Sequence, residues 1–349
     1  MLPDLSVIEG KYLDDILNQP QALQDTLHAL NGHSGVNQLA ARLKKGKFKR
    51  ILLTGMGSSF HALYPLNLQL VNHGVTAFMV ETSELIHYKS RCFDPQTLIV
   101  AVSQSGRSAE IVRLLEINHK HSPLIAVTNT PDSPLASRAD AAVLTHAGQE
   151  FSVSCKTYVS ALMALKWVGD VLCEVSPRRT VNELKQAAPA VSAYLSNWKE
   201  YVVELAARLK DVAHLFLVGR GASLAAVGTG ALIVKESDHF HAEGMSSAAF
   251  RHGPFEMLSR ETFVLIFSGD AKTRELNRKL LEDIREQDGG AELVGEQASV
   301  PAFRLPSVPG TLAPIVEILP VQMITLALAA QMGREPGRFE LASKVTTIE

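Results

Sequence analysis

The sequence carries the same pattern twice, and this internal repeat restricts the possible folds more than any other feature. Residues 51–60 read ILLTGMGSSF and residues 215–224 read LFLVGRGASL, each an apolar run followed by Gly-x-Gly-x-Ser and a helical pattern. A second pair, LIVAVSQSGRSAEIVRLL from Leu98 and FVLIFSGDAKTRELNRKL from Phe263, lies at nearly the same separation. Two matches at one separation indicate duplication of a whole domain.

Short apolar runs alternate with helical periods in both copies. Continuous apolar strands separated by helices, such as the helix expected at Ala109–Asn118, are typical of a parallel sheet covered on both faces. The sequence therefore predicts an α/β fold. The expected strands are Arg50–Thr54, Val75–Val80, Thr97–Val102, Leu124–Thr128 and Ala141–Leu144 in the first copy, and Leu215–Val218, Phe263–Phe267 and Glu292–Val294 in the second.

The repeat also divides the chain into parts. We expect an N-terminal helical segment at 1–47 that packs on the first domain, and a first domain at 48–180. A polar, helix-prone linker at 181–209 leads to a second domain with a C-terminal tail at 210–349.

Composition excludes several classes of partner. The formal net charge is −2 without a basic block, so we expect neither a nucleic-acid nor a membrane partner. Three scattered cysteines in no metal-like spacing indicate reduced thiols and a cytoplasmic protein. The first ten residues lack a basic and an apolar region, so we expect no signal peptide. The apolar stretch Leu312–Gly333 includes two prolines, a glutamate and a glutamine, which favours a buried core or interface helix over a membrane span.

Hydroxyl-rich turns follow two of the expected strands. Ser103-Gln104-Ser105-Gly106 comes after one strand and Ser58-Ser59 after another, and a helix follows each turn. Ligands of open parallel sheets bind beyond the carboxyl ends of the strands, where helix N-termini favour anions. Serine is also a common helix N-cap, so a single turn of this kind is often only structural. Two turns together predict a phosphate site in the first domain, whereas the second domain keeps only Ser268 of the paired serines.

Several motifs together resemble the sugar isomerase (SIS) family. They are GMGSSFHA, SQSGRSAEIV, VTNTPDSPLASRAD, ALIVKESDHFHAEGMSSAAFRHGP and the terminal LASKVTTIE. The doubled arrangement is similar to the isomerase portion of glucosamine-6-phosphate synthase and covers nearly the whole chain. The resemblance implies two tandem SIS domains, each a five-stranded parallel sheet between helices in a flavodoxin-like, three-layer αβα arrangement.

The resemblance also implies roles for individual residues. Glu236 matches the acid/base that moves a proton between sugar C1 and C2, His252 the ring-opening histidine from a neighbouring subunit, and Lys344 the lysine that forms a Schiff base. It therefore implies a homodimer with shared sites. The residues expected to bind the sugar phosphate are Gly57, Ser58, Ser59, Ser103, Gln104, Ser105, Ser108, Val153 and Ser343.

Elementary chemistry is compatible with these roles. A 1,2-proton shift needs a carboxylate whose pKa burial raises, and Glu236 lies in an apolar helical stretch where we expect burial. Gly-Pro after His252 stops the helix and presents the imidazole at its end. Each residue also has a plain alternative: a surface glutamate, a structural histidine and a solvated tail lysine. His239, His241 and Glu243 do not converge as three ligands, so we expect no metal and no cofactor.

Two departures from the family pattern bear on function. The glutamate of the serine loop is replaced by Arg107, and the chain begins Met1-Leu2-Pro3, so we expect no glutaminase domain to supply ammonia. The sequence thus predicts a SIS-type glucosamine-6-phosphate deaminase that releases ammonia and fructose 6-phosphate. Alternatives are a phosphosugar aldose/ketose isomerase, an enzyme acting on another amino-sugar phosphate, amide transfer with a separate glutaminase chain, and a non-catalytic sugar-phosphate sensor.

Overall fold

The structure, a computed structural model, describes residues 4–30, 34–119, 121–287, 289–341 and 344. These residues form two compact units, each built around one parallel sheet. The first-sheet unit consists mainly of Gln21–Gln149 and Lys156–Gln186. The second-sheet unit consists of residues 4–20, Glu150–Cys155 and Ala187–Glu340. Each unit is thus assembled from stretches that are separate along the chain.

The first sheet has five parallel strands in the order β2-β1-β3-β4-β5, the flavodoxin-like order expected. Strands β3 and β4 are buried throughout and consist mainly of β-branched and other apolar residues, because helices cover both faces. The predicted strand limits agree closely except at β2, which lies two residues later at its start. The strands are β1 (Arg50–Gly55), β2 (Ala77–Glu81), β3 (Thr97–Val102), β4 (Leu124–Thr128) and β5 (Ala141–Leu144).

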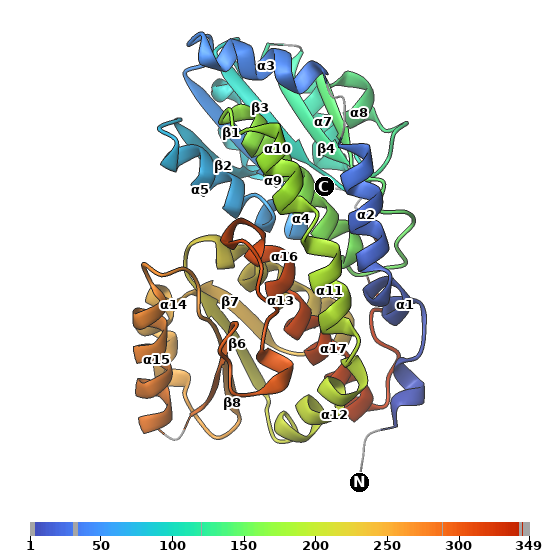
Figure 1. Ribbon diagram of the computed structural model, residues 1–349, viewed down its shortest axis with the longest axis vertical. Helices are drawn as coiled ribbons and strands as arrows, with labels where there is room; N and C mark the ends of the chain where they lie inside the picture. The colour runs from blue at the N-terminus through green and yellow to red at the C-terminus, as the bar shows by residue number, and fades with distance from the viewer. Residues whose placement is uncertain (1–3, 31–33, 120, 288, 342–343, 345–349) are drawn as a thin grey trace. The chain divides into compact units, whose positions relative to one another are not determined.

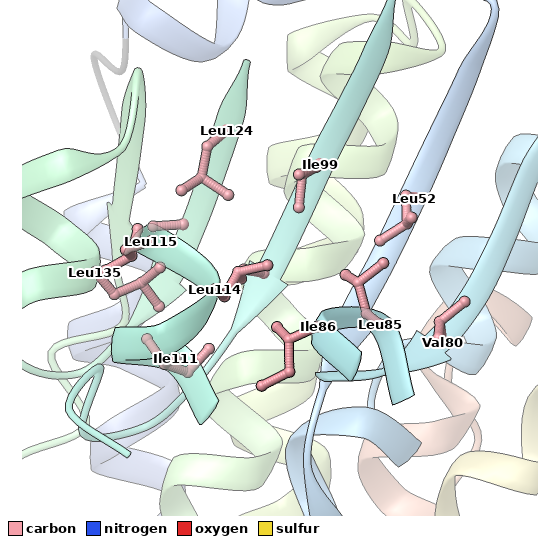
Figure 2. Packing of buried hydrophobic residues seen from close by; sticks show 12 residues of the cluster. Leu52, Val80, Leu85, Ile86, Ile99, Ile111, Leu114, Leu115, Leu124 and Leu135 are labelled. Carbon is pink, nitrogen blue, oxygen red and sulfur yellow. The ribbon is translucent and has the colours of Figure 1, made fainter. Parts of the chain in front are cut away.

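Two helical layers enclose this sheet. Side chains of α6 (Thr82–Tyr88), α7 (Ala109–Asn118) and α8 (Pro134–Arg138) form one apolar cluster with the sheet, and Figure 2 shows Leu114 of α7 close to Ile99 of β3. The other layer contains α9 (Lys156–Leu172), which contacts β4 and several other helices. Those helices are α3 (Ser34–Lys44), α4 (Gly57–His61), α5 (Tyr64–Asn72) and α10 (Pro177–Leu184).

The second sheet has four parallel strands in the order β7-β6-β8-β9, so the expectation of five strands is wrong for the described residues. After β9 the chain makes one isolated bridge, Gly295 to Arg304, instead of a further strand. Three prolines between residues 301 and 309 explain this, because proline has no N–H for a strand ladder. The strands are β6 (His214–Gly219), β7 (Ala242–Ser246), β8 (Thr262–Phe267) and β9 (Gly290–Val294).

The two sheets have the same register at their centres. Arg50 of β1 pairs with Thr97 of β3, and the corresponding His214 of β6 pairs with Thr262 of β8. In the second sheet one face is covered by α14 (Ser247–Arg251) and α15 (Arg274–Glu286) (Figure 1). Helix α13 (Leu224–Asp238) packs on β6 and β7. The duplication inferred from the sequence is therefore present in the backbone.

The long apolar stretch near the C-terminus is a core helix, as predicted. Gly310–Met332 is the single stretch of the described residues that is long and apolar enough to span a membrane, and 94% of its most apolar window is buried inside the protein. It comprises α16 (Ala313–Glu317) and α17 (Leu319–Met332). Helix α17 contacts α13 and α12 (Trp198–Arg208), which follows α11 (Ala187–Leu195).

The start of the chain differs from expectation. Residues 4–20 belong to the second-sheet unit rather than packing on the first domain. The hydroxyl of Tyr12 in α1 (Lys11–Leu17) lies 3.2 Å from Oγ1 of Thr325, and Gln19 at the start of α2 (Gln19–Ala29) exchanges two hydrogen bonds with Gln322. Both polar partners lie on the otherwise apolar α17, so these bonds fix where the N-terminal helices pack.

Candidate functional site

The serine-rich turns lie at the point where the first sheet reverses its strand order. Strands β1 and β3 are neighbours, and crossovers from them run to opposite sides, β1 to β2 and β3 to β4. A Cβ built on Gly55, the last residue of β1, lies 3.0 Å from the carbonyl oxygen of Val102, the last residue of β3. The two turns thus start side by side at the place where flavodoxin-like sheets bind ligands.

The turn after β3 is braced by its own hydroxyls. The Ser103 Oγ accepts a 3.1 Å hydrogen bond from the N–H of Gly106, and the Ser105 Oγ accepts one of 3.2 Å from the N–H of Arg107. Gly106 has a φ of +60°, and a Cβ there would lie 2.4 Å from Oγ of Ser133. Glycine is therefore required, because both the left-handed backbone and the contact with the next turn exclude a side chain.

Several hydroxyls of these turns remain available to a ligand. Ser108 is the N-cap of α7, yet its side chain makes no capping hydrogen bond. Ser58 and Ser59 lie in α4, which begins at Gly57 with a φ of +51°. Hydroxyl groups beside a helix N-terminus supply hydrogen-bond donors and a favourable dipole for an anion. The side chain of the partly exposed Gln104 belongs to the same turn, whose backbone is held by the hydrogen bond from Asn129 N–H to its carbonyl.

Glu236 lies near the C-terminal end of α13 in the second-sheet unit. It is half-buried, so the expectation that burial surrounds its carboxylate is only partly met. The two residues that follow, Ser237 and Asp238, are buried. Burial raises the pKa of Asp238 well above its usual range, although Ser237 and Arg334 act in the opposite direction. Sequence reasoning missed this second acid, whose Oδ2 is buried without a hydrogen-bond partner among the described residues.

The tail is attached next to Glu236. The N–H of Gly337 donates to both the carbonyl oxygen (3.3 Å) and the Oγ (3.1 Å) of Ser237. A Cβ on Gly337 would lie 2.9 Å from Oγ of Ser152, the neighbour of the predicted contact residue Val153. Glu236, Val153 and the tail attachment thus belong to one unit and are linked through adjacent residues.

Lys344 lies seven residues beyond this attachment point. A chain of seven residues spans at most about 25 Å, which bounds the region that the lysine can reach from Gly337. Lys344 is half-buried. Ser343, the other predicted tail residue, lies outside the described residues.

His252 stands at an exposed helix end. It is the C-cap of α14, and its N–H donates to the carbonyl of Ala249 at 2.9 Å. Gly253 follows with a φ of +149°, and Pro254 begins a new turn, so the helix stops where the Gly-Pro pair predicts. The imidazole is therefore presented to solvent rather than to the interior of its own unit.

The predicted site residues fall into two groups. The serine turns belong to the first-sheet unit, whereas Glu236, His252 and Val153 belong to the second-sheet unit. The first group can bind an anion, and the second supplies groups able to transfer protons. Within the described ranges, no three His, Cys, Asp or Glu side chains are grouped so that they could hold a metal ion.

Comparison with known proteins gives consistent matches along the chain. The SIS domain family model matches residues 46–168 and 208–332. A glutamine–fructose-6-phosphate aminotransferase (isomerizing) from Pyrococcus horikoshii is 29% identical over 97% of this chain and 57% of its own length. The chain thus spans little more than half the length of the curated relatives it matches.

Solved structures share the fold. The C-terminal domain of glucosamine-fructose-6-phosphate aminotransferase from Francisella tularensis superposes with a TM-score of 0.82 at 22% identity, over 95% of this chain and 99% of that one. A glucosamine-6-phosphate deaminase from Thermotoga maritima superposes with a TM-score of 0.77 at 18% identity, over 97% of this chain and 100% of that one.

Proposed function

Because this chain belongs to the SIS domain family in both of its α/β units, we propose that it is a phosphosugar isomerase that deaminates glucosamine 6-phosphate. The observation that carries the proposal is the pair of hydroxyl-rich turns at the β1/β3 reversal point, beside the N-terminus of α7. That arrangement suits the phosphate group of a sugar phosphate. With the phosphate bound there, C1 and C2 of the sugar remain accessible to the catalytic groups.

Binding comes first in the proposed reaction. Ser103, Ser105 and Ser108 hold the 6-phosphate together with the hydroxyls of the β1 turn. Fixing one end of the substrate gives orientation, which removes much of the entropic cost of bringing C1 and C2 to the catalytic groups. The backbone near Val153 and the predicted Ser343 then contact the sugar itself.

Proton transfer follows ring opening. His252, from the partner in a homodimer, moves a proton between the ring oxygen and the C1 hydroxyl to give the open-chain aldehyde. Glu236 removes the proton at C2 and a proton is returned to C1, which passes through an enolamine. The product imine at C2 adds water and expels ammonia, leaving fructose 6-phosphate. Atoms balance: glucosamine 6-phosphate and water give fructose 6-phosphate and ammonia.

The tail lysine has a related role. The amine of Lys344, once deprotonated, condenses with the C2 carbonyl of the ketose and releases water. This Schiff base keeps the ketose in its open-chain form, from which either direction of the reaction can proceed. The attachment of Gly337 to Ser237 supports the proposal, because it fixes the start of the tail beside the residue that follows Glu236.

The direction of the reaction rests on two likenesses. The deaminase from Thermotoga maritima is covered over its whole length by this chain, and this shared fold supports the choice of deamination. The relative from Pyrococcus horikoshii is an aminotransferase matched over 57% of its length, and this likeness makes amination of fructose 6-phosphate the second candidate.

One assay separates these candidates. Purified protein is incubated with glucosamine 6-phosphate, and ammonia and fructose 6-phosphate are measured together. Equal release of both products supports deamination. Conversion of fructose 6-phosphate to glucosamine 6-phosphate with added ammonia, or with glutamine and an added glutaminase, favours amination. Turnover of neither substrate at micromolar enzyme under all of these conditions contradicts both.

A further inference from the structure

The second-sheet unit contains a crevice that the proposed reaction does not use. Its cavity of about 750 Å³ lies at the carboxyl ends of β6, β8 and β9. Figure 1 labels β6 and β8. We call it the second crevice and define it by Arg220, Ser223, Arg274 and Glu317. Because β6 and β8 repeat the register of β1 and β3, it is the duplicate of the place where the serine turns lie.

The duplicate has different chemistry. The alignment of the repeats puts Arg220 in the position of Met56, and Arg274 in the position of Ala109 at the start of the following helix. Two apolar residues of the first domain are thus replaced by arginines, whose guanidinium groups bind phosphate with several directed hydrogen bonds. The exchange argues for a changed ligand rather than for simple loss of a site.

The two arginines differ from the other arginines of the cavity in their ion pairing, although acidic residues such as Asp270 and Glu296 also line it. Other arginines of the cavity have acidic partners: Arg278 lies 2.8 Å from Glu275, and Arg285 lies 3.0 Å from Glu292. Arg220 and Arg274 form no ion pair within the described ranges. The Nε of Arg220 is in addition buried without a hydrogen-bond partner there.

Glu317 adds an unsatisfied acid to the same cavity. It is only 5% exposed, and its Oε1 accepts a 2.7 Å hydrogen bond from the hydroxyl of Ser223. Its Oε2 is buried and has no hydrogen-bond partner among the described residues. Burial raises the pKa of this carboxyl group to about 7, although the bond from Ser223 opposes the shift. An orphaned buried oxygen is costly, so a ligand group that meets it gains affinity.

We propose that the second crevice binds a phosphorylated polyol, with its phosphate on Arg220 and Arg274 and a hydroxyl on Oε2 of Glu317. A hydroxyl both donates and accepts, so it pairs with this carboxyl group in either protonation state. The volume is within the range of small-molecule sites. The proposal does not depend on the reaction assigned to the serine turns.

Binding is tested in a chain whose first site is disabled. Calorimetry on the Ser103→Ala/Ser105→Ala variant uses glucitol 6-phosphate as the probe, which has no carbonyl group to react. We expect one bound molecule per chain, with Kd raised at least tenfold by Arg220→Met, which restores the residue of the first repeat. Glu317→Leu is expected to weaken binding similarly. Arg278→Met is the matched control, and it should change Kd less than twofold because Arg278 is already paired.

Three results would overturn the proposal. They are no binding at millimolar probe, binding that Arg220→Met leaves unchanged in a variant with native thermal stability, and equal affinity for inorganic phosphate and glucitol 6-phosphate. Turnover of glucosamine 6-phosphate by the wild-type chain is measured separately. If the wild-type chain does not turn over glucosamine 6-phosphate but the second crevice still binds glucitol 6-phosphate, the proposed function is contradicted and the second-crevice proposal is not.

Discussion

The backbone N–H of Gly337 is shared between two oxygens of Ser237, the residue directly after Glu236. The C-terminal tail is therefore anchored by the same turn that positions the proposed proton-transfer acid. The proposed roles of Glu236 and Lys344 can each be tested by substitution.

Replacing Glu236 by glutamine separates an enzyme from a sensor. Glutamine keeps the shape of the side chain but cannot accept the C2 proton, so kcat should fall roughly 10²- to 10⁴-fold. Binding of glucosamine 6-phosphate, measured by calorimetry, should change little. Glu282→Gln on the exposed face of α15 is the control. Unaltered turnover in Glu236→Gln would remove this residue from the mechanism.

Gly106→Ala tests the turn that holds the phosphate. The left-handed backbone costs an alanine about 1–2 kcal/mol, and contact with Ser133 adds to this. We expect a lower free energy of unfolding by denaturant titration and a raised KM. Because the nearest atoms belong to the Ser133 side chain, Ser133→Gly in the same chain should recover part of the loss. A Gly106→Ala variant with native KM would show that the turn does not bind substrate.

Lys344 is tested by chemical trapping. Borohydride reduces a Schiff base to a stable secondary amine, so treatment with fructose 6-phosphate should attach one sugar phosphate to the wild-type chain. Lys344→Arg keeps the charge but cannot form the adduct, and mass spectrometry should find it unmodified. Lys210→Arg serves as a matched surface control. Equal labelling of all three proteins would assign the adduct to another amine.

Shared sites in a homodimer are tested by complementation. His252 is exposed in its own unit, as a residue that acts in a neighbour's site should be. Glu236→Gln and His252→Ala homodimers should both be inactive, whereas their heterodimer contains one site with neither substitution. Differently tagged subunits allow the heterodimer to be purified and assayed. An inactive, verified heterodimer would argue that both residues serve the same subunit.

Glu317 should make stability depend on pH. Its pKa is about 7 when folded and near 4.5 when unfolded, so the folded state holds the extra proton between these values. The contribution of Glu317 to the free energy of unfolding is therefore fully present below pH 4.5. It is lost as the pH rises to about 7, which lowers the free energy of unfolding by at most about 3 kcal/mol. Glu317→Gln removes this loss, and its advantage over wild type should grow between pH 5 and 8. Thermal unfolding at several pH values checks this, with Glu282→Gln expected to follow wild type.

Much of the frame was predictable because strong local signals agreed with the final packing. Strands β3, β4 and β5 and helix α7 have the predicted limits, since each is a continuous apolar run or a clear helical period. Strand β7 was missed because its sequence, AEGMS, is polar and contains glycine, and only pairing with β6 makes it a strand. The fifth strand of the second sheet was wrongly inherited from the family pattern, against the local evidence of three prolines.

The candidate site was predictable in its motifs but not in its surroundings. The serine turns follow from strand ends and helix starts, which are local features. Half-burial of Glu236 and the double hydrogen bond between Gly337 and Ser237 depend on residues a hundred positions apart. The same holds for Glu317 in the second crevice, because no periodic pattern in the sequence indicates that its Oε2 lacks a hydrogen-bond partner among the described residues. Such long-range packing has no signature in a single sequence.

The short stretch Glu150–Cys155 is part of one compact unit although the chain on both sides of it belongs to the other. A gene divided between residues 186 and 187 would therefore give two fragments that each lack pieces of their own unit. Limited proteolysis inside this stretch should destabilise the second-sheet unit, because Glu150–Cys155 is part of it. Neither half of the duplicated sequence is thus a continuous folding unit, even though each has its own sheet.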